Sequence, residues 1–199
     1  MDDIVIIDNA IPAEDQDIIE RLVTGDSFGW IYNPNTAYTT ELVEKLKFPD
    51  EFFKDSLDSP LFSHILWNEY GRNSHLFNVF IPLLDAVPYK FHRLVRCKIN
   101  LTIPVQGSTP DTHSYPHVDY IDDEGLITGL YYVNDSDGDT FLFNEMNPHR
   151  GALTVARRIT PKRGRLVLFN ANRYHAGNNP INHPTRLTLN FNFYPAGAK

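Results

Sequence analysis

The sequence predicts a mainly β protein, a sandwich or barrel of short strands supported by helices that precede it. Helical patterns are confined to the first part of the chain. From residue 93 onward, short alternating segments are separated by turn residues. The chain has 199 residues, 42% of them hydrophobic, which is enough for one full-sized core. We therefore expect a single domain over residues 1–199, with helical support in 1–92 and the β core in 93–195.

Composition argues against several classes of function. The formal net charge of −7 argues against general binding of a nucleic-acid backbone, and it favours a neutral or basic substrate. No apolar run approaches the roughly 18 residues that a membrane span needs, so no membrane partner is expected. The start Met1-Asp2-Asp3 lacks the basic residues of a signal peptide, and the lone Cys97 cannot form an internal disulfide. Both features favour a cytoplasmic protein, and the sequence does not indicate an oligomeric state.

The first part of the chain begins with a strand and a helix. The apolar run from Ile4 to Asp8 predicts a short buried strand. Pro12 suits the first turn of the helix that follows, and Gly25 is typical of a helix end. Residues 26–40 are typical of a loop or hairpin. Further helical stretches are expected at 61–67 and at 74–84, the second kinked or ended near Pro82.

The second part of the chain alternates with the period of a β-strand. Residues 94–103 place Arg96, Lys98, Asn100 and Thr102 on one face and apolar side chains on the other. A loop rich in Ser, Thr, Pro and Asp follows at 104–116. Further strands are expected at 126–133, 140–144, 152–158, 165–170 and 185–194.

The sharpest local motif is His117-Val118-Asp119. Residues i and i+2 of an extended strand point to the same side, so His117 and Asp119 can reach one ion. His175 is the best candidate for a third ligand, because it closely follows the strand expected at 165–170. Two histidines and one carboxylate on one face of a metal are typical of non-haem iron(II) oxygenases. This arrangement leaves positions for a bidentate 2-oxo acid and for O2, so we expect a catalytic iron(II) at these three residues.

A second polar strand face begins at Arg186 and continues through Thr188, Asn190 and Asn192. Polar side chains along one face of a strand in an otherwise apolar core indicate a lined cavity. An inward-facing arginine is costly unless a carboxylate pairs with it. The distal carboxylate of 2-oxoglutarate would supply that partner in bidentate geometry, so Arg186 is expected to bind the co-substrate.

Taken together, residues 94–194 resemble the double-stranded β-helix core, a cupin-like jelly roll, of iron(II)/2-oxoglutarate oxygenases, in particular the prolyl 4-hydroxylase-like group. The resemblance rests on four segments in the family's order. They are His117-Val118-Asp119, the segment 130–134 with Gly138-Asp139-Thr140, the hairpin 161–169, and His175-Ala176-Gly177 followed by Arg186. It implies a dioxygenase that converts 2-oxoglutarate to succinate while hydroxylating an unidentified substrate: a peptidyl-prolyl or other amino-acid residue, a small molecule or a nucleobase. It also implies iron(II), O2 and stimulation by ascorbate.

The resemblance assigns further roles by position. Tyr132 lies where the family often has a tyrosine that binds the distal carboxylate, and Thr188 resembles the hydroxyl partner of Arg186. Asn100 corresponds to a residue near the co-substrate, although the longer loop 104–116 departs from the family and could form a lid. Related halogenases lack the carboxylate ligand, so Asp119 favours hydroxylation.

Four alternatives stay open at this point. His113 could replace His117 as a ligand, although Pro110 and Pro116 make a helix there improbable. The acidic run 135–139 has some features of a calcium loop but lacks its spacing, so a β-turn is favoured. The protein could also be a cupin-like metal-binding or structural protein without oxygenase activity, or a metal-dependent hydrolase, which would need a general base beside the metal.

Overall fold

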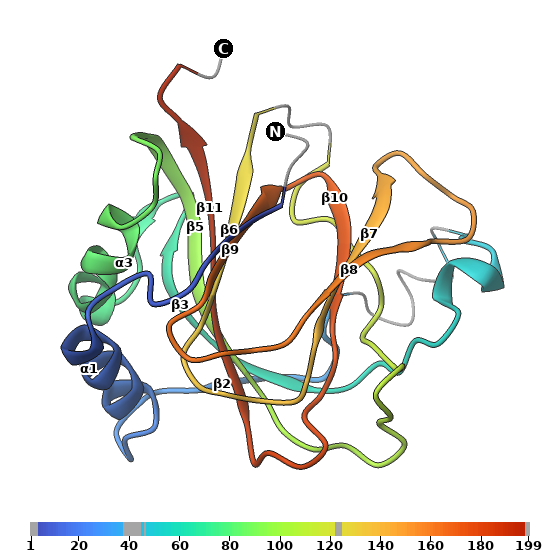
Figure 1. The fold of residues 1–199 in the computed structure, drawn as a ribbon, viewed down its shortest axis with the longest axis horizontal. Coiled ribbons are helices and arrows are strands. Elements are labelled where there is room, and N and C mark those ends of the chain that lie inside the picture. Colours follow the sequence, from blue (N-terminus) through green and yellow to red (C-terminus); the bar gives the residue numbers. More distant parts are fainter. Residues whose placement is uncertain (1–3, 38–44, 46, 122–124, 198–199) are drawn as a thin grey trace.

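The structure is a computed structural model that describes residues 4–37, 45, 47–121 and 125–197. Within these residues the chain forms an eight-stranded sheet and a three-stranded sheet that face each other (Figure 1). The large sheet has the order β1 (Val5–Ile7), β9 (Leu166–Asn170), β6 (Ile127–Tyr132), β11 (Arg186–Pro195), β5 (Phe91–Thr102), β3 (Leu61–Asn68) and β2 (Ile31–Asn33), with β4 (Gly71–Arg72) paired to β3. The small sheet has the order β10 (Arg173–Gly177), β7 (Thr140–Met146) and β8 (Val155–Ile159).

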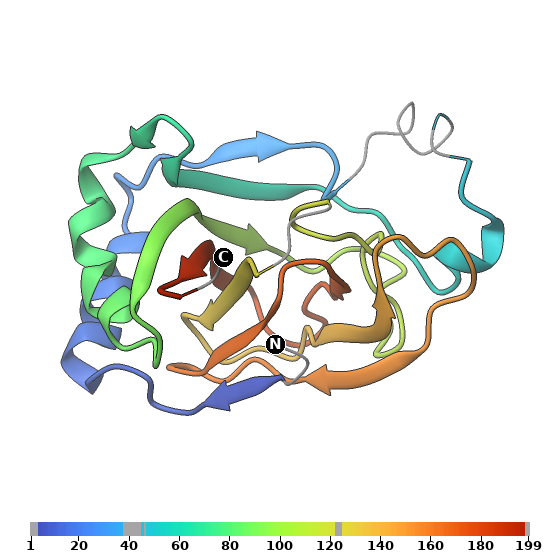
Figure 2. The ribbon, with the colours of Figure 1, turned by 90° about the horizontal axis from the view of Figure 1, so that it is seen from above.

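The helices lie on the outer face of the large sheet, where Figure 2 shows them along one side of the molecule. They are α1 (Ala13–Val23), the 3-10 helix η2 (His75–Phe80) and α3 (Ile81–Asp85), while the 3-10 turn η1 (Asp50–Phe53) lies apart from them. Pro12 occupies the N-cap position of α1 without a side-chain hydrogen bond, and Glu14 and Asp15 in the first turn suit the helix dipole. The expected mainly β fold with supporting helices is confirmed.

One segment expected to be helical is a strand. Residues 61–67 lie within β3, which pairs with β5 on one side and β2 on the other. A short apolar run does not distinguish strand from helix by its periodicity, and here the neighbouring strands decide. The helical expectation for 74–84 is confirmed as η2 and α3. Pro82 lies in the first turn of α3, and the helix continues to Asp85, so Pro82 does not end it. Strands therefore also come from within residues 1–92.

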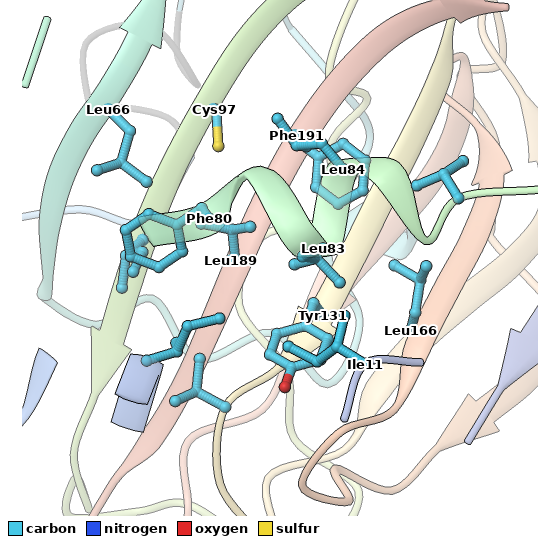
Figure 3. Packing of buried hydrophobic residues seen from close by; sticks show 14 of the residues in the cluster. Ile11, Leu66, Phe80, Leu83, Leu84, Cys97, Tyr131, Leu166, Leu189 and Phe191 are labelled. Carbon is cyan, nitrogen blue, oxygen red and sulfur yellow. The ribbon is translucent and has the colours of Figure 1, made fainter. Parts of the chain in front are cut away.

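The central strands carry apolar residues on one face and polar residues on the other. Leu189 and Phe191 of β11 point toward the helices and pack with Phe80 and Leu83 in the main core (Figure 3). Gly129 of β6 is opposite Phe191, and a Cβ there would lie 2.2 Å from the ring. The opposite, polar face of β5 and β11 points between the two sheets. Its side chains form four cross-strand pairs: Arg96 with Asn192, Lys98 with Asn190, Asn100 with Thr188, and Thr102 with Arg186.

In the part of the chain that the structure describes, no helix has the length and apolar character needed to cross a bilayer.

Candidate metal centre and co-substrate cavity

Three predicted ligands meet between the two sheets. The ligand atoms of His117, Asp119 and His175 all lie within 4.8 Å of one another. His117 is not part of a regular strand. It forms an isolated antiparallel bridge with His175 of β10, with backbone N–H to O distances of 3.0 and 2.9 Å. The backbone N–H of Asp119 donates to the Ala171 carbonyl at 3.1 Å. Pairing with the chain around β10 therefore aligns the His-x-Asp segment with the third ligand.

Both histidine rings are held by backbone carbonyls. Nδ1 of His117 lies 3.1 Å from the Tyr115 carbonyl oxygen, and Nδ1 of His175 lies 3.0 Å from the Arg173 carbonyl oxygen. These contacts assign the proton to Nδ1 and leave each Nε2 with a lone pair for a metal. Burial and the neighbouring His175 lower the pKa of His117 to about 3, which keeps the imidazole neutral. Two imidazole nitrogens and one carboxylate are a donor set that suits iron(II).

Asp119 is surrounded by hydrogen-bond donors. Arg96 donates to Oδ1 at 2.6 Å, while Oδ2 accepts from Thr128 at 2.6 Å and from Asn192 at 2.9 Å. A longer contact of 3.4 Å joins Asn190 to Oδ2. Burial alone would raise the pKa of Asp119, but Arg96 and the other donors outweigh it and hold the pKa well below its ordinary value. The carboxylate is therefore ionised and fixed in orientation before any metal binds.

A cavity extends from these ligands toward Arg186. It is lined by the polar face of β5 and β11, by β10, and by loops on either side. The lining residues are Thr36, Ser59, Leu61, Lys98, Asn100, Thr102, Ser114, His117, Asp119, Leu130, Thr140, His175, Ala176, Gly177, Asn178, Asn179, Arg186, Thr188 and Asn190.

Arg186 is buried at one end of the cavity. Asp119 and its hydrogen-bond donors lie at the other end. Its Nε donates to the Gly138 carbonyl and its Nη2 to Oγ1 of Thr140, both at 2.7 Å. Among the described residues, no carboxylate lies within 4.0 Å of the guanidinium. Burial lowers the pKa of this arginine, which reflects the cost of holding the charge without an anionic partner. The free charge makes this end of the cavity suitable for a carboxylate.

Tyr132 and Thr140 form a layer around Arg186. The Tyr132 hydroxyl donates to Oγ1 of Thr140 at 2.6 Å, and the Arg186 guanidinium carbon lies 5.7 Å from the Tyr132 ring centre. Tyr132 is completely buried and does not line the cavity, whereas Thr140 does. Oγ1 of Thr140 accepts from both neighbours, so its own proton is available for an acceptor in the cavity. Sequence reasoning did not select Thr140 as a site residue, although the Gly138-Asp139-Thr140 turn marked its position.

The structure brings Asn100 and Thr188 to the same cavity, opposite each other on β5 and β11. Oδ1 of Asn100 and Oγ1 of the neighbouring Thr102 are buried and have no hydrogen-bond partner. Unpaired buried polar atoms are costly, so these two oxygens indicate that a polar ligand or water completes the cavity.

Lys98 also lines the cavity, a position that sequence analysis recognised only as part of a polar strand face. No hydrogen bond or ion pair engages its ammonium group within the described residues. Burial, together with the nearby positive charge of Arg96, lowers the pKa of Lys98 to about 8. The side chain is therefore a half-buried cation without a counter-ion among the described residues.

The competing interpretations of other residues find no support. His113 is not part of the metal-ligand group; its Nδ1 lies 2.8 Å from the Ser114 carbonyl oxygen and its ring packs against Phe141 and Phe143. Asp137, in the acidic run 135–139, accepts hydrogen bonds from the backbone N–H groups of residues 181–183. It therefore stabilises that loop. In the loop 104–116, the Ser114 N–H donates to the Gly177 carbonyl at 2.8 Å, which holds part of the loop against the cavity wall.

Comparison with known proteins agrees with this geometry. Residues 105–194 match the sequence profile of the 2OG-Fe(II) oxygenase superfamily. No sequence among curated proteins matches the chain.

Solved structures share the fold across nearly the whole chain. An oxidoreductase of the 2OG-Fe(II) oxygenase family from Burkholderia pseudomallei is 14% identical, with a TM-score of 0.61 over 96% of this chain and 84% of that one. HygX from Streptomyces hygroscopicus, with nickel and 2-oxoglutarate bound, is 13% identical, with a TM-score of 0.56 over 98% and 83%. A prolyl hydroxylase from Trichoplax adhaerens, in complex with a hypoxia inducible factor peptide fragment, is 15% identical, with a TM-score of 0.54 over 96% and 83%. At these identities the likeness establishes the fold, and the expected double-stranded β-helix is confirmed.

Proposed function

We propose that the protein is an iron(II)- and 2-oxoglutarate-dependent dioxygenase that hydroxylates its substrate, because residues 105–194 match the sequence profile of the 2OG-Fe(II) oxygenase superfamily. The observation that carries the proposal is the pairing of two features in one cavity. One is a group of two histidines and an ionised carboxylate whose ligand atoms lie within 4.8 Å of one another. The other is the buried Arg186, which has no carboxylate partner in the described part of the chain.

Each residue has a distinct task in this proposal. His117, Asp119 and His175 hold the iron. When bound together, iron(II), 2-oxoglutarate and O2 supply the oxidising chemistry, with release of succinate and carbon dioxide. Arg186 binds the distal carboxylate through its free N–H groups, and the Thr140 hydroxyl donates to the same carboxylate. Tyr132 orients Thr140 from behind, a role one step removed from the direct contact expected from the sequence.

Asn100 and Thr188 contact the middle of the co-substrate in this proposal, because they face each other between the metal end and the Arg186 end of the cavity. The substrate is an amino-acid residue, such as peptidyl proline, a small molecule or a nucleobase. The proposal includes one domain over residues 1–199, stimulation by ascorbate, a lid role for the loop 104–116, and a cytoplasmic setting.

A cupin-like binding protein without oxygenase activity is the second candidate. Such a protein needs the metal ligands but has no need of an unpaired buried arginine in the same cavity, which costs stability when nothing binds it. A hydrolase is disfavoured because Asp119, the one acidic residue among the described residues that line the cavity, is committed to Arg96 and its other donors and cannot serve as a separate base.

The test is iron(II)-dependent conversion of 2-oxoglutarate to succinate by the full chain, supplemented with ascorbate and screened against candidate substrates. We expect a low background rate that a true substrate increases. His175→Ala should abolish turnover and weaken iron binding, whereas His149→Ala on the surface should have no effect on either. Wild-type protein that binds iron(II) but not 2-oxoglutarate would favour the cupin-like alternative, and undiminished iron binding by His175→Ala would refute the proposed metal centre.

A further inference from the structure

Lys98 is a half-buried cation, and no described residue of the chain provides an anionic partner for it. It lines the cavity from β5, and neither a hydrogen bond nor an ion pair engages its ammonium group. Its neighbour on the same strand face, Arg96, differs in this respect, because Arg96 is bound to Asp119, Asn190 and Asn192. A cation in this position is expected to have an anionic partner, which must come from a ligand.

The strand register fixes the position of Lys98 along the cavity. Lys98 is directly opposite Asn190, whose side-chain amide lies 3.4 Å from Oδ2 of Asp119. Side chains opposite each other on neighbouring strands have their Cβ atoms about 5 Å apart. Arg186 begins β11, four residues before Asn190, and pairs with Thr102. Lys98 is therefore near the metal ligands, whereas Arg186 is at the other end of the cavity.

The charges that line the cavity match a molecule with two carboxylates. Among the described residues that line the cavity, Asp119 is the only acidic one, and it is paired with Arg96. The two uncommitted charges are both positive, one at each end. This local charge is opposite to the net charge of −7 of the whole chain, which favoured a neutral or basic substrate but not a basic co-substrate.

We infer that Lys98 binds the carboxylate next to the 2-oxo group of 2-oxoglutarate, while Arg186 binds the distal carboxylate. This inference rests on the proposed function. Lys98 then acts as a co-substrate-binding residue that neutralises the carboxylate bound at the metal end. At pH 7 the ammonium is in its charged form, because its pKa is about 8.

The experiment measures binding, without turnover, by isothermal titration calorimetry at pH 7 on the full chain loaded with Mn(II). Two probes are used: 2-oxoglutarate, and 2-oxopentanoate, which has a methyl group in place of the distal carboxylate. Lys98→Met should weaken both probes by the same factor, roughly ten- to hundredfold, the range for a lost hydrogen bond to a charged group. Arg186→Met should weaken 2-oxoglutarate by a similar factor and leave 2-oxopentanoate unchanged. Lys54→Met, at an exposed position, is the matched control.

The pattern across the two probes decides the result. An equal loss for both probes in Lys98→Met supports the inference. A loss of affinity for 2-oxoglutarate alone would put Lys98 at the distal carboxylate. No loss of affinity for either probe would show that Lys98 does not bind the co-substrate. Both results overturn the inference while leaving the proposed function intact. Failure of wild-type protein to bind 2-oxoglutarate would instead refute the proposed function. Lys98→Gln serves as a second variant if Lys98→Met does not fold.

Discussion

Replacing Thr128 by valine tests whether the hydrogen bonds around Asp119 serve the metal. Thr128 is completely buried on β6, and its hydroxyl donates to Oδ2 of Asp119 at 2.6 Å while accepting from Asn192 at 2.9 Å. Valine has nearly the same shape, so the change removes the hydroxyl without creating a cavity. Oδ2 retains Asn192 at 2.9 Å and the longer contact to Asn190, so Asp119 stays in place but is less firmly oriented.

The magnitude follows from the type of interaction that is lost. A hydrogen bond to a charged group contributes about 1.5–3 kcal/mol, and the free energy of unfolding of the metal-free protein should fall by about that amount. Loss of a group that orients a metal ligand typically weakens metal binding by about 10- to 100-fold. Anaerobic equilibrium dialysis with iron(II) measures the second effect, and urea denaturation measures the first. Thr160→Val, an exposed position, is the control. If Thr128→Val loses stability but binds iron as tightly as wild type, the network supports folding alone and the reasoning is wrong.

Three further predictions concern the cavity, the core and the loop before β11. Thr140→Val should reduce the affinity of the Mn(II)-loaded protein for 2-oxoglutarate more than Tyr132→Phe does, because Thr140 lines the cavity and Tyr132 acts through Thr140. If calorimetry shows the reverse order, Tyr132 contacts 2-oxoglutarate directly. Gly129→Ala should destabilise the protein by about 1–3 kcal/mol in urea denaturation, since the new Cβ would lie 2.2 Å from the Phe191 ring, and Phe191→Leu should recover part of the loss. Asp137 accepts backbone hydrogen bonds from Ile181 and Asn182, and although burial raises its pKa, these bonds lower it overall. Because the folded-state pKa is below the unfolded value, the carboxylate stabilises the fold above about pH 4, and this stability is lost as the pH falls through the lowered pKa. Asp137→Asn should therefore show a shallower loss of unfolding free energy than wild type between roughly pH 5 and pH 2, and identical acid profiles would contradict this role.

Local sequence patterns were sufficient for the main elements of the fold and for the residues that form the metal centre. The alternation in β5 and β11 predicted one polar face on each strand, and these faces do line the cavity. His117, Asp119 and His175 were selected by residue type, spacing and order along the chain, and the structure brings their ligand atoms within 4.8 Å. The same patterns could not distinguish β3 from a helix, because a short, largely apolar segment becomes a strand only when other strands are available to pair with it.

What the sequence determined by itself was therefore which chemical groups are present and which face of each strand carries them. The tertiary structure decided which of these groups meet. The register that sets Lys98 opposite Asn190, and Arg96 opposite Asn192, joins residues more than ninety positions apart. No local periodicity encodes such a register, since it depends on how whole strands pack between the helices and the second sheet. That packing commits Arg96 to Asp119 and leaves Lys98 and Arg186, equally basic in the sequence, as the two free charges of the cavity.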